Sequence, residues 1–213
     1  GGLLFAKLLV PETESPSYDE NSAEGDLVDK PANVIDAAAA GASAGLQLAL
    51  NVGAMLLAFI GLIAMINGIF SGVGGWFGMP ELSLELLLGW LFSPLAFLIG
   101  VPWSEAVVAG SFIGQKLVVN EFVAYLNFAP YLKDEVLING VAMSDHTKAI
   151  ISFALCGFAN LSSVAILLGG LGSMAPNRRG TIAKFGLKAV LAGSLSNLMS
   201  ATIAGFFLAL TAM

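Results

Sequence analysis

The chain has 213 residues, of which 57% are hydrophobic and 11% are charged, and its mean hydropathy is +0.85. Soluble domains carry roughly 25% charged residues, so this composition excludes an ordinary soluble domain and indicates an integral membrane protein. The net charge of −6 comes mostly from one polar segment near the N-terminus, and no basic stripe with interleaved aromatic residues is present, which argues against nucleic-acid binding.

The first residues, 1–10, are interpreted as the end of a preceding transmembrane helix. The chain starts Gly-Gly-Leu-Leu-Phe, without a methionine or a signal-peptide pattern, so we hypothesise that it is the C-terminal piece of a longer membrane protein. The acidic segment Pro11–Pro31 has no hydrophobic period and is expected outside the bilayer. A polar cytoplasmic loop, followed by a short interfacial helix around Ala32–Ala40, is therefore expected to occupy residues 11–36.

A long transmembrane helix is predicted at 37–72. No charged residue lies between positions 37 and 80, and about 20 apolar residues are enough to span a bilayer. Gln47 and Asn51 are one turn apart and share a face, which serves either contacts between helices or the lining of a cavity. The glycine-rich stretch Ser71–Gly78 is expected to break the helix.

Residues 82–100 are barely long enough to span a bilayer and contain Glu85 and Pro94, so they form either a span or an interfacial helix. The distribution of basic residues decides between the two. Four of them lie between the last two predicted spans, which places that loop in the cytoplasm. Each span takes the chain to the other side of the membrane. The predicted spans agree with a cytoplasmic loop here only if residues 82–100 do not cross, which favours the interfacial helix. The four residues are Arg178, Arg179, Lys184 and Lys188.

Residues 103–132 are too polar and too interrupted for a plain span. Each half is about 15 residues, which reaches only about 22 Å in a helix. Two such halves predict a re-entrant hairpin that enters and leaves on one side, with Val118–Phe122 (VVNEF) at its tip. Irregular backbone at membrane depth is tolerated only where it is buried in protein or lines a cavity.

Two further spans follow the hairpin. Residues 148–173 are predicted to form a broken transmembrane helix, because Gly157–Ser163 (GFANLSS) puts a glycine and a polar run in the middle of an apolar stretch. Residues 181–211 form the last predicted transmembrane helix. One face of this helix carries small polar residues, which we assign to hydrogen bonds between helices. They are Ser194, Asn197 and Ser200.

The chemistry of the chain is concentrated at these two interruptions. A buried charge is costly unless something satisfies it, so Glu121 in the hairpin tip is a candidate binding group. A carboxylate accepts two hydrogen bonds, which suits a vicinal diol. Asn160 and Ser163 lie three residues apart and point the same way on a helix, whereas Ser162 is expected to point elsewhere. Two alternatives remain open: an ion pair of Glu121 with Lys116, and a purely adhesive role for the GFANLSS run.

Hairpins and broken helices that meet at the bilayer midplane are typical of secondary transporters. At these residues the whole chain resembles the C-terminal half of a concentrative nucleoside transporter, particularly the bacterial sodium-coupled members. The stretches that carry the resemblance are PANVIDAAA (Pro31–Ala39), GLQLALNVGAM (Gly45–Met55), GWLFSPLAFLIGVPW (Gly89–Trp103), VNEFVAY (Val119–Tyr125) and KAIISFALCGFANLSS (Lys148–Ser163).

The resemblance implies an all-α membrane fold that is the second half of an inverted-repeat transporter, in a homotrimer with residues 37–72 as a scaffold helix and trimer contact. It implies that Glu121 binds the ribose hydroxyls of a uridine-like nucleoside and that Asn160 and Ser163 also hold the ribose. Phe158 then packs beside the base, and Leu48 is a further candidate for base packing. Sodium is the coupling ion implied, although some bacterial relatives use protons. Its site and the base-reading motif have no counterpart here, and both are expected in the other half of such a transporter.

The predicted function is an ion-coupled symporter that imports nucleosides by alternating access across the cell inner membrane, and that contacts lipid on many passes. One alternative is a channel for small polar solutes lined by Gln47, Asn51 and Asn160. Another is a membrane enzyme with Glu121 as general base, although a partnering His, a second close carboxylate and a metal-ligand set are all missing. Cys156 is expected to be a small buried hydrophobe and His146 to lie in a solvated loop. The tryptophans expected at the membrane interface are Trp76, Trp90 and Trp103.

Overall fold

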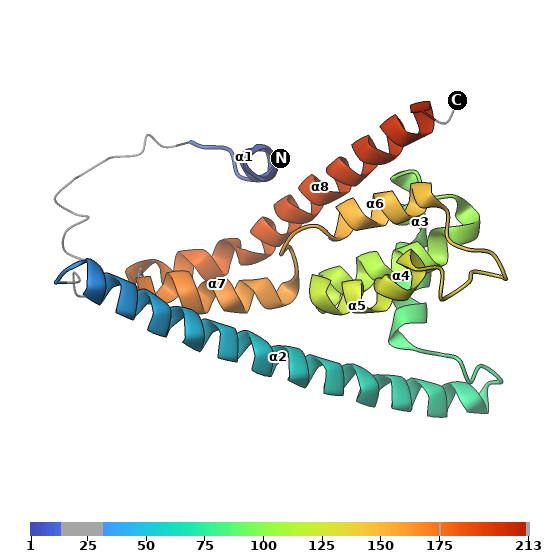
Figure 1. The fold of residues 1–213 in the computed structure, drawn as a ribbon, viewed down its shortest axis with the longest axis horizontal. Coiled ribbons are helices and arrows are strands. Elements are labelled where there is room, and N and C mark those ends of the chain that lie inside the picture. Colours follow the sequence, from blue (N-terminus) through green and yellow to red (C-terminus); the bar gives the residue numbers. More distant parts are fainter. Residues whose placement is uncertain (14–31, 175, 212–213) are drawn as a thin grey trace.

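The computed structural model describes residues 1–13, 32–174 and 176–211. Within these ranges the chain is helical apart from turns, loops and one isolated β-bridge between Ile138 and Val141. The elements are α1 (Gly2–Leu9), α2 (Val34–Trp76), α3 (Leu84–Leu98), α4 (Trp103–Val118), α5 (Glu121–Leu132), α6 (Asp145–Leu155), α7 (Leu161–Met174), the 3₁₀ turn η1 (Pro176–Arg178) and α8 (Arg179–Thr211), as Figure 1 shows.

Two of the described helices, α2 and α8, are long and apolar enough to cross a membrane. The pair α3 and α4 reaches the same length and hydropathy when taken together, but it is bent by 115°. The prediction of an all-α membrane protein is confirmed. α1 lies within residues 1–10, which were assigned to the end of a preceding helix, and it packs against α8. The polar loop predicted for 11–36 falls largely on residues 14–31, which lie outside the described residues.

α2 begins earlier than predicted. Asn33 caps it by accepting a hydrogen bond from the Asp36 backbone N–H at 2.9 Å. The Asp36 carboxylate in turn accepts a bond from the Ala32 backbone N–H at 2.8 Å. These bonds satisfy N–H groups that have no partner inside the helix. The prediction of a separate interfacial helix around Ala32–Ala40 is therefore wrong, since that segment is continuous with the long helix.

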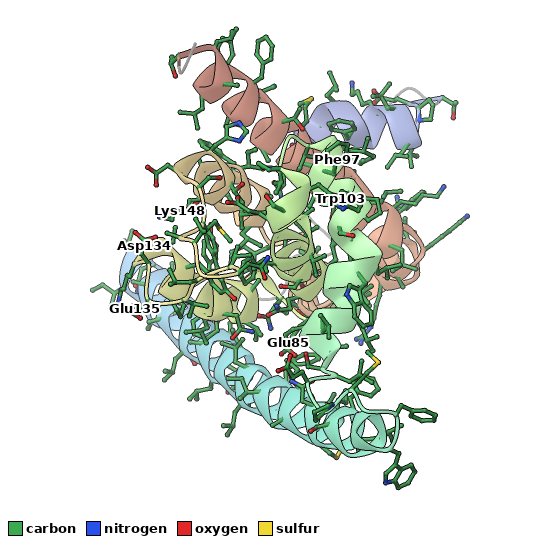
Figure 2. The ribbon with its side chains drawn as sticks, turned by 90° about the vertical axis from the view of Figure 1, so that its right-hand side faces the viewer. Glu85, Phe97, Trp103, Asp134, Glu135 and Lys148 are labelled. Carbon is green, nitrogen blue, oxygen red and sulfur yellow. The ribbon has the colours of Figure 1, made fainter. Side chains whose placement is uncertain are left out.

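α2 ends within the stretch Ser71–Gly78 where the break was predicted, although its first glycines remain helical and the helix continues to Trp76. Each glycine in a helix costs only about 1 kcal/mol relative to alanine and removes no hydrogen bond, so a glycine-rich stretch can stay helical. The helix ends where Gly78 adopts a positive φ of 73°, a conformation that favours glycine. A hydrogen bond from Asn67 Nδ2 to Glu85 Oε2, 2.9 Å long, then ties α2 to the start of α3, where Figure 2 shows Glu85.

α3 and α4 pack closely through glycines. A Cβ atom on Gly110 would lie 2.7 Å from the Ser93 backbone nitrogen, and one on Gly114 would lie 2.7 Å from the Leu88 Cβ. Real side chains do not tolerate such distances, so only glycine lets the two helices approach this far. The helix predicted at 82–100 thus lies along one arm of the hairpin.

The bend between α3 and α4 is tight. Gly100 has a positive φ of 107° there. On either side of it, the Phe97 and Trp103 rings meet edge to face with centroids 5.5 Å apart, as Figure 2 shows near the top of α3. Pro94 lies inside α3, which remains a continuous helix. The buried core extends from this bend between α3, α4, α5 and α6, where the Phe112 ring lies 5.2 Å from that of Phe128.

The α6–α7 pair is one helix interrupted in the middle. Ser144 caps α6, and its own N–H and hydroxyl both donate to the Glu105 carboxylate of α4, each at 2.9 Å. The chain leaves helical geometry after Leu155 and resumes it at Leu161. Figure 1 shows the two halves lying one after the other along α8, and both contact it. The structure thus has a helix break within residues 148–173, as the sequence indicates.

Two single residues lie where the sequence did not place them. His146 is not in a loop: it is in the first turn of α6, partly buried, with Nε2 3.0 Å from the Gly205 carbonyl oxygen of α8. Cys156 is not buried but exposed at the end of α6, because the break turns it out of the helix. Lys148, in the first turn of α6, contacts Asp134 Oδ1 in the preceding loop at 2.7 Å, and Figure 2 shows the two together.

Candidate functional site

The hairpin reverses direction within two residues. α4 ends at Val118 and α5 begins at Glu121. Asn120 caps α5 with its side-chain oxygen, which accepts a hydrogen bond from the Val123 backbone N–H at 2.9 Å. Glu121 therefore lies in the first turn of a helix, where the free N–H groups and the helix dipole favour a negative charge. The capping asparagine is what aims this carboxylate.

The broken helix restarts in the same way. Asn160 is buried and precedes α7, and its Oδ1 accepts three hydrogen bonds: from the Ser163 N–H at 2.7 Å, the Ser163 hydroxyl at 2.8 Å and the Ser162 hydroxyl at 2.7 Å. These donors fix which side of the amide is oxygen. The Asn160 Nδ2 then faces the hairpin and donates to Glu121 Oε2 at 2.5 Å.

The prediction that Ser162 points away from this group is wrong. Its hydroxyl lies 2.7 Å from Asn160 Oδ1 and 3.3 Å from the Val119 carbonyl oxygen in the hairpin tip. The prediction assumed regular helix geometry, in which residues two apart face different ways. The helix begins only at Leu161, so that spacing does not apply across the start of α7.

A cavity of about 400 Å³ lies between α2, the start of α5 and the start of α7. Four of the five residues predicted to bind substrate line it together, although they come from three separate stretches of the chain. These four are Leu48, Glu121, Phe158 and Asn160. The fifth, Ser163, lies behind Asn160, where its hydroxyl bonds to Asn160 and to the Phe158 carbonyl oxygen.

The wall that α2 gives to this cavity is apolar. Val52 and Leu56 follow Leu48 at four-residue intervals and therefore share its face, a helical signal that would have found them in the sequence. Gln47 and Asn51 were considered as polar lining instead, and the Asn51 side chain lies outside the described residues. Other lining residues that the sequence reasoning did not single out as substrate contacts are Asn120, Phe122, Ser162 and Ile166.

Lys116 does not form the ion pair with Glu121 that was considered for it. Its ammonium is buried and donates to the Ala154 carbonyl oxygen at 2.8 Å. The ion pairs found within 4.0 Å in the described parts of the chain involve neither residue. The carboxylate of Glu121 is thus left to the cavity and to Asn160. Among the described residues there is also no cluster of three or more His, Cys, Asp or Glu side chains that could hold a metal ion.

Comparison with known proteins identifies the family of this chain. Residues 1–205 match the family model described as "Na+ dependent nucleoside transporter C-terminus". The chain belongs to this family. The family resemblance expected from the sequence is therefore confirmed, as is its placement among transporters rather than enzymes. The enzyme alternative is set aside.

Similar proteins of this family have been found in several bacteria. The chain is 60% identical to an uncharacterised transporter of Haemophilus influenzae, covering 99% of this chain and 50% of the relative. It is 55% identical to the nucleoside permease NupC of Helicobacter pylori, covering 100% and 49%. The solved structure of CNTnw in an inward-facing substrate-bound state is 64% identical with a TM-score of 0.84, covering 99% and 48%. The chain thus spans about half the length of these relatives. Its two helices that are long and apolar enough to cross a membrane fit a multi-pass membrane protein.

Proposed function

We propose that this protein imports nucleosides across the cell inner membrane as an ion-coupled symporter that works by alternating access. Three findings support the proposal. The family is described as sodium-dependent, a relative 55% identical is named a nucleoside permease, and CNTnw has been solved in inward-facing, outward-facing and intermediate states. The hairpin and broken helix of this chain are the elements that such carriers use for binding.

The observation that carries the proposal is the contact between Glu121 and Asn160 at the cavity wall. This hydrogen bond of 2.5 Å joins Glu121, in the first turn of α5, to Asn160, the residue that caps α7. In our proposal the ribose binds here, with its 2′- and 3′-hydroxyls donating to the ionised Glu121 carboxylate and one of them accepting from Asn160. Phe158 and Leu48, exposed at 74% and 50%, line the same cavity and give the base an apolar surface.

Ser163 was expected to hold the ribose directly. In the structure both its N–H and its hydroxyl bond to Asn160 Oδ1. The geometry therefore supports a role in which Ser163 contributes to ribose binding by orienting Asn160. Substitution of Ser163 would then weaken binding through the amide rather than through a lost contact with the sugar.

The coupling ion and the oligomer are proposed from the family alone. We propose sodium, bound outside the residues of this chain, and a homotrimer in which α2 belongs to the scaffold. Light scattering of the full-length protein in detergent tests the trimer directly, since a monomer or dimer would contradict it.

The deciding experiment is uridine uptake into proteoliposomes that contain the full-length protein, with and without an inward sodium gradient at fixed pH. Accumulation above the external concentration that depends on sodium is the expected result. Uptake driven only by a pH gradient would leave the symporter proposal intact and identify the proton as the coupling ion. Equilibration without accumulation under either gradient would favour a channel, which conducts but cannot concentrate its solute.

A further inference from the structure

Lys116 is a buried charge that the proposed binding of nucleoside does not use. It lies in the last turn of α4, two residues before the hairpin tip, and its side chain is 3% exposed. Removing an ammonium group from water is costly, and it is tolerated when other groups replace the lost hydration. The hydrogen-bond partners of Lys116 Nζ therefore indicate the role of this residue.

Oxygen atoms from two other elements surround this ammonium. The Ala154 carbonyl, near the end of α6, accepts a hydrogen bond at 2.8 Å. The side chain of Asn197 in α8 is satisfied in only one orientation, in which its oxygen lies 2.6 Å from Lys116 Nζ and its nitrogen donates to the Cys156 carbonyl at 2.9 Å. Lys116 and Asn197 together thus bind two carbonyl groups that the interrupted helix leaves free.

The charge distribution suits a cation at this point. The C-terminal end of a helix carries a partial negative charge, and α6 ends at Leu155 beside Lys116. The carboxylate that acts on this ammonium over a longer distance is Glu121, on the other arm of the hairpin. Gly157 completes the packing, since a Cβ atom there would lie about 2.8–3.0 Å from the side-chain amide atoms of Asn197.

We propose that Lys116 is a built-in cation for the broken helix: its ammonium binds the carbonyl oxygens at the break and so fixes the hairpin against it. Lys116 is then a positioning residue, which keeps Glu121 of the hairpin beside Asn160 of the broken helix without touching the nucleoside. The inference rests on the proposed function, because it assigns the effect to nucleoside binding. Loss of the cation would leave the two halves of the ribose site unfixed, and the lost preorganisation would appear as weaker binding.

The test is the affinity of the full-length protein for uridine, measured by calorimetry at a fixed sodium concentration. Lys116→Met keeps the length of the side chain and removes its charge and donors, and it should weaken binding by about 10- to 100-fold. The matched control is Lys133→Met, on the exposed end of the same hairpin with 71% of its side chain accessible, which should bind as the wild type does. Unchanged affinity in folded Lys116→Met protein would overturn the proposal.

Chemical rescue separates a cation from mere packing. Lys116→Ala leaves room for methylammonium, which carries a positive charge and N–H donors and should restore much of the affinity. Tetramethylammonium carries the charge without the donors and should not restore it. Equal rescue by both ions, or by neither in protein that remains folded, would overturn the proposal.

A second variant covers the case in which Lys116 cannot be replaced without unfolding. Asn197→Ala retains the lysine and removes one of its oxygen ligands, so we expect uridine binding to weaken by about 3- to 10-fold. Wild-type affinity in this variant would overturn the proposal. The wild-type protein is the reference for the function itself: if it does not bind uridine, the proposed function fails first and this inference fails with it.

Discussion

The hairpin tip and the helix break solve one structural problem in different ways. Each interrupts a helix, and each restarts it with an asparagine whose side-chain oxygen accepts the N–H three residues on: Asn120 from Val123 and Asn160 from Ser163. The tip is held by its own neighbours, since the Val119 N–H also bonds back to the Gln115 carbonyl at 2.8 Å. The break is held by residues more than 35 positions away in the sequence, Lys116 and Asn197.

This difference separates two kinds of asparagine cap. Asn120 has a local role, which is to start α5 and present Glu121. Asn160 starts α7 but also donates to Glu121 across the gap between the two elements. Loss of the Asn120 cap should therefore change stability alone, whereas loss of the Asn160 cap should change both stability and binding. The predictions below test this division, from the largest effect to the smallest.

The largest effect is expected for Glu121→Gln. This variant keeps the size of the side chain and removes its charge, which weakens every hydrogen bond that the carboxylate accepts. Hydrogen bonds to charged groups contribute about 1.5–3 kcal/mol each, so uridine affinity should fall by about 100-fold or more. Uptake in proteoliposomes and calorimetry measure the loss. An unchanged thermal unfolding temperature shows that the fold is intact, and near-normal uptake would remove Glu121 from the site.

The paired variants Asn160→Ala and Asn120→Ala test the comparison most directly. Both remove a helix cap, which costs about 1 kcal/mol of stability. Only Asn160→Ala also removes the donor to Glu121, so it should weaken uridine binding by about 10- to 100-fold, while Asn120→Ala should stay within about threefold of wild type. Denaturant unfolding and calorimetry on both proteins give the two quantities. Equal losses of affinity would show that the two caps have the same role.

Substrate variants change the same contacts from the ligand side. 2′-Deoxyuridine and 3′-deoxyuridine each lack one hydroxyl and should bind about 10-fold more weakly than uridine to the wild type. In Glu121→Gln protein the difference between uridine and its deoxy analogues should shrink. Competition with labelled uridine measures all of these affinities, and equal affinity of the wild type for the three nucleosides would contradict the ribose assignment.

Among the residues hydrogen-bonded to Asn160, Ser162 should give the smallest loss of affinity when it is replaced by alanine. Ser162→Ala removes one of the donors to Asn160 Oδ1 and leaves the two from Ser163 in place. A neutral hydrogen bond contributes about 1 kcal/mol, which corresponds to about a fivefold loss of affinity. Ser163→Ala should have a larger effect, because the second contact of its hydroxyl, with the Phe158 carbonyl, is close, whereas the second contact of the Ser162 hydroxyl, with the Val119 carbonyl, is long at 3.3 Å. The reverse order would show that Ser162 is the more important of the two.

Most of the helical architecture was predictable from hydropathy and from the positions of glycine, proline and polar residues in the sequence. The division of 103–132 into two helices was predictable because the polar VNEF sequence interrupts the apolar stretch. The end of α2 was predictable from the glycines near Trp76, but its start was not, because Ala32–Ala40 was assigned to a separate helix and the Asn33 cap was not recognised. The close contact of α3 with α4 was not predicted either, because glycines 110 and 114 matter only once a partner helix is present.

The site divides in the same way. Glu121 and Asn160 were identified from the cost of burying polar groups, and the family resemblance added Phe158 and Leu48. The positions of Ser162 and Lys116 depend on how the break bends, and sequence spacing assumes a regular helix. What could not be derived was which polar groups satisfy one another. The sequence suggested an ion pair for Lys116, and the structure gives it carbonyl oxygens instead.

The three hydrogen bonds that Asn160 Oδ1 accepts fix the orientation of its amide at the cavity wall. Because the oxygen is fully engaged, Asn160 presents only N–H groups, while Glu121 beside it presents only lone pairs. A group bound between them must donate a hydrogen bond to Glu121 and accept one from Asn160. A hydroxyl does both. A fluorine or a methyl ether of nearly the same size cannot donate, and an ammonium cannot accept. In the proposed ribose site, the pair therefore selects ligands by the direction of their hydrogen bonds as well as by their size.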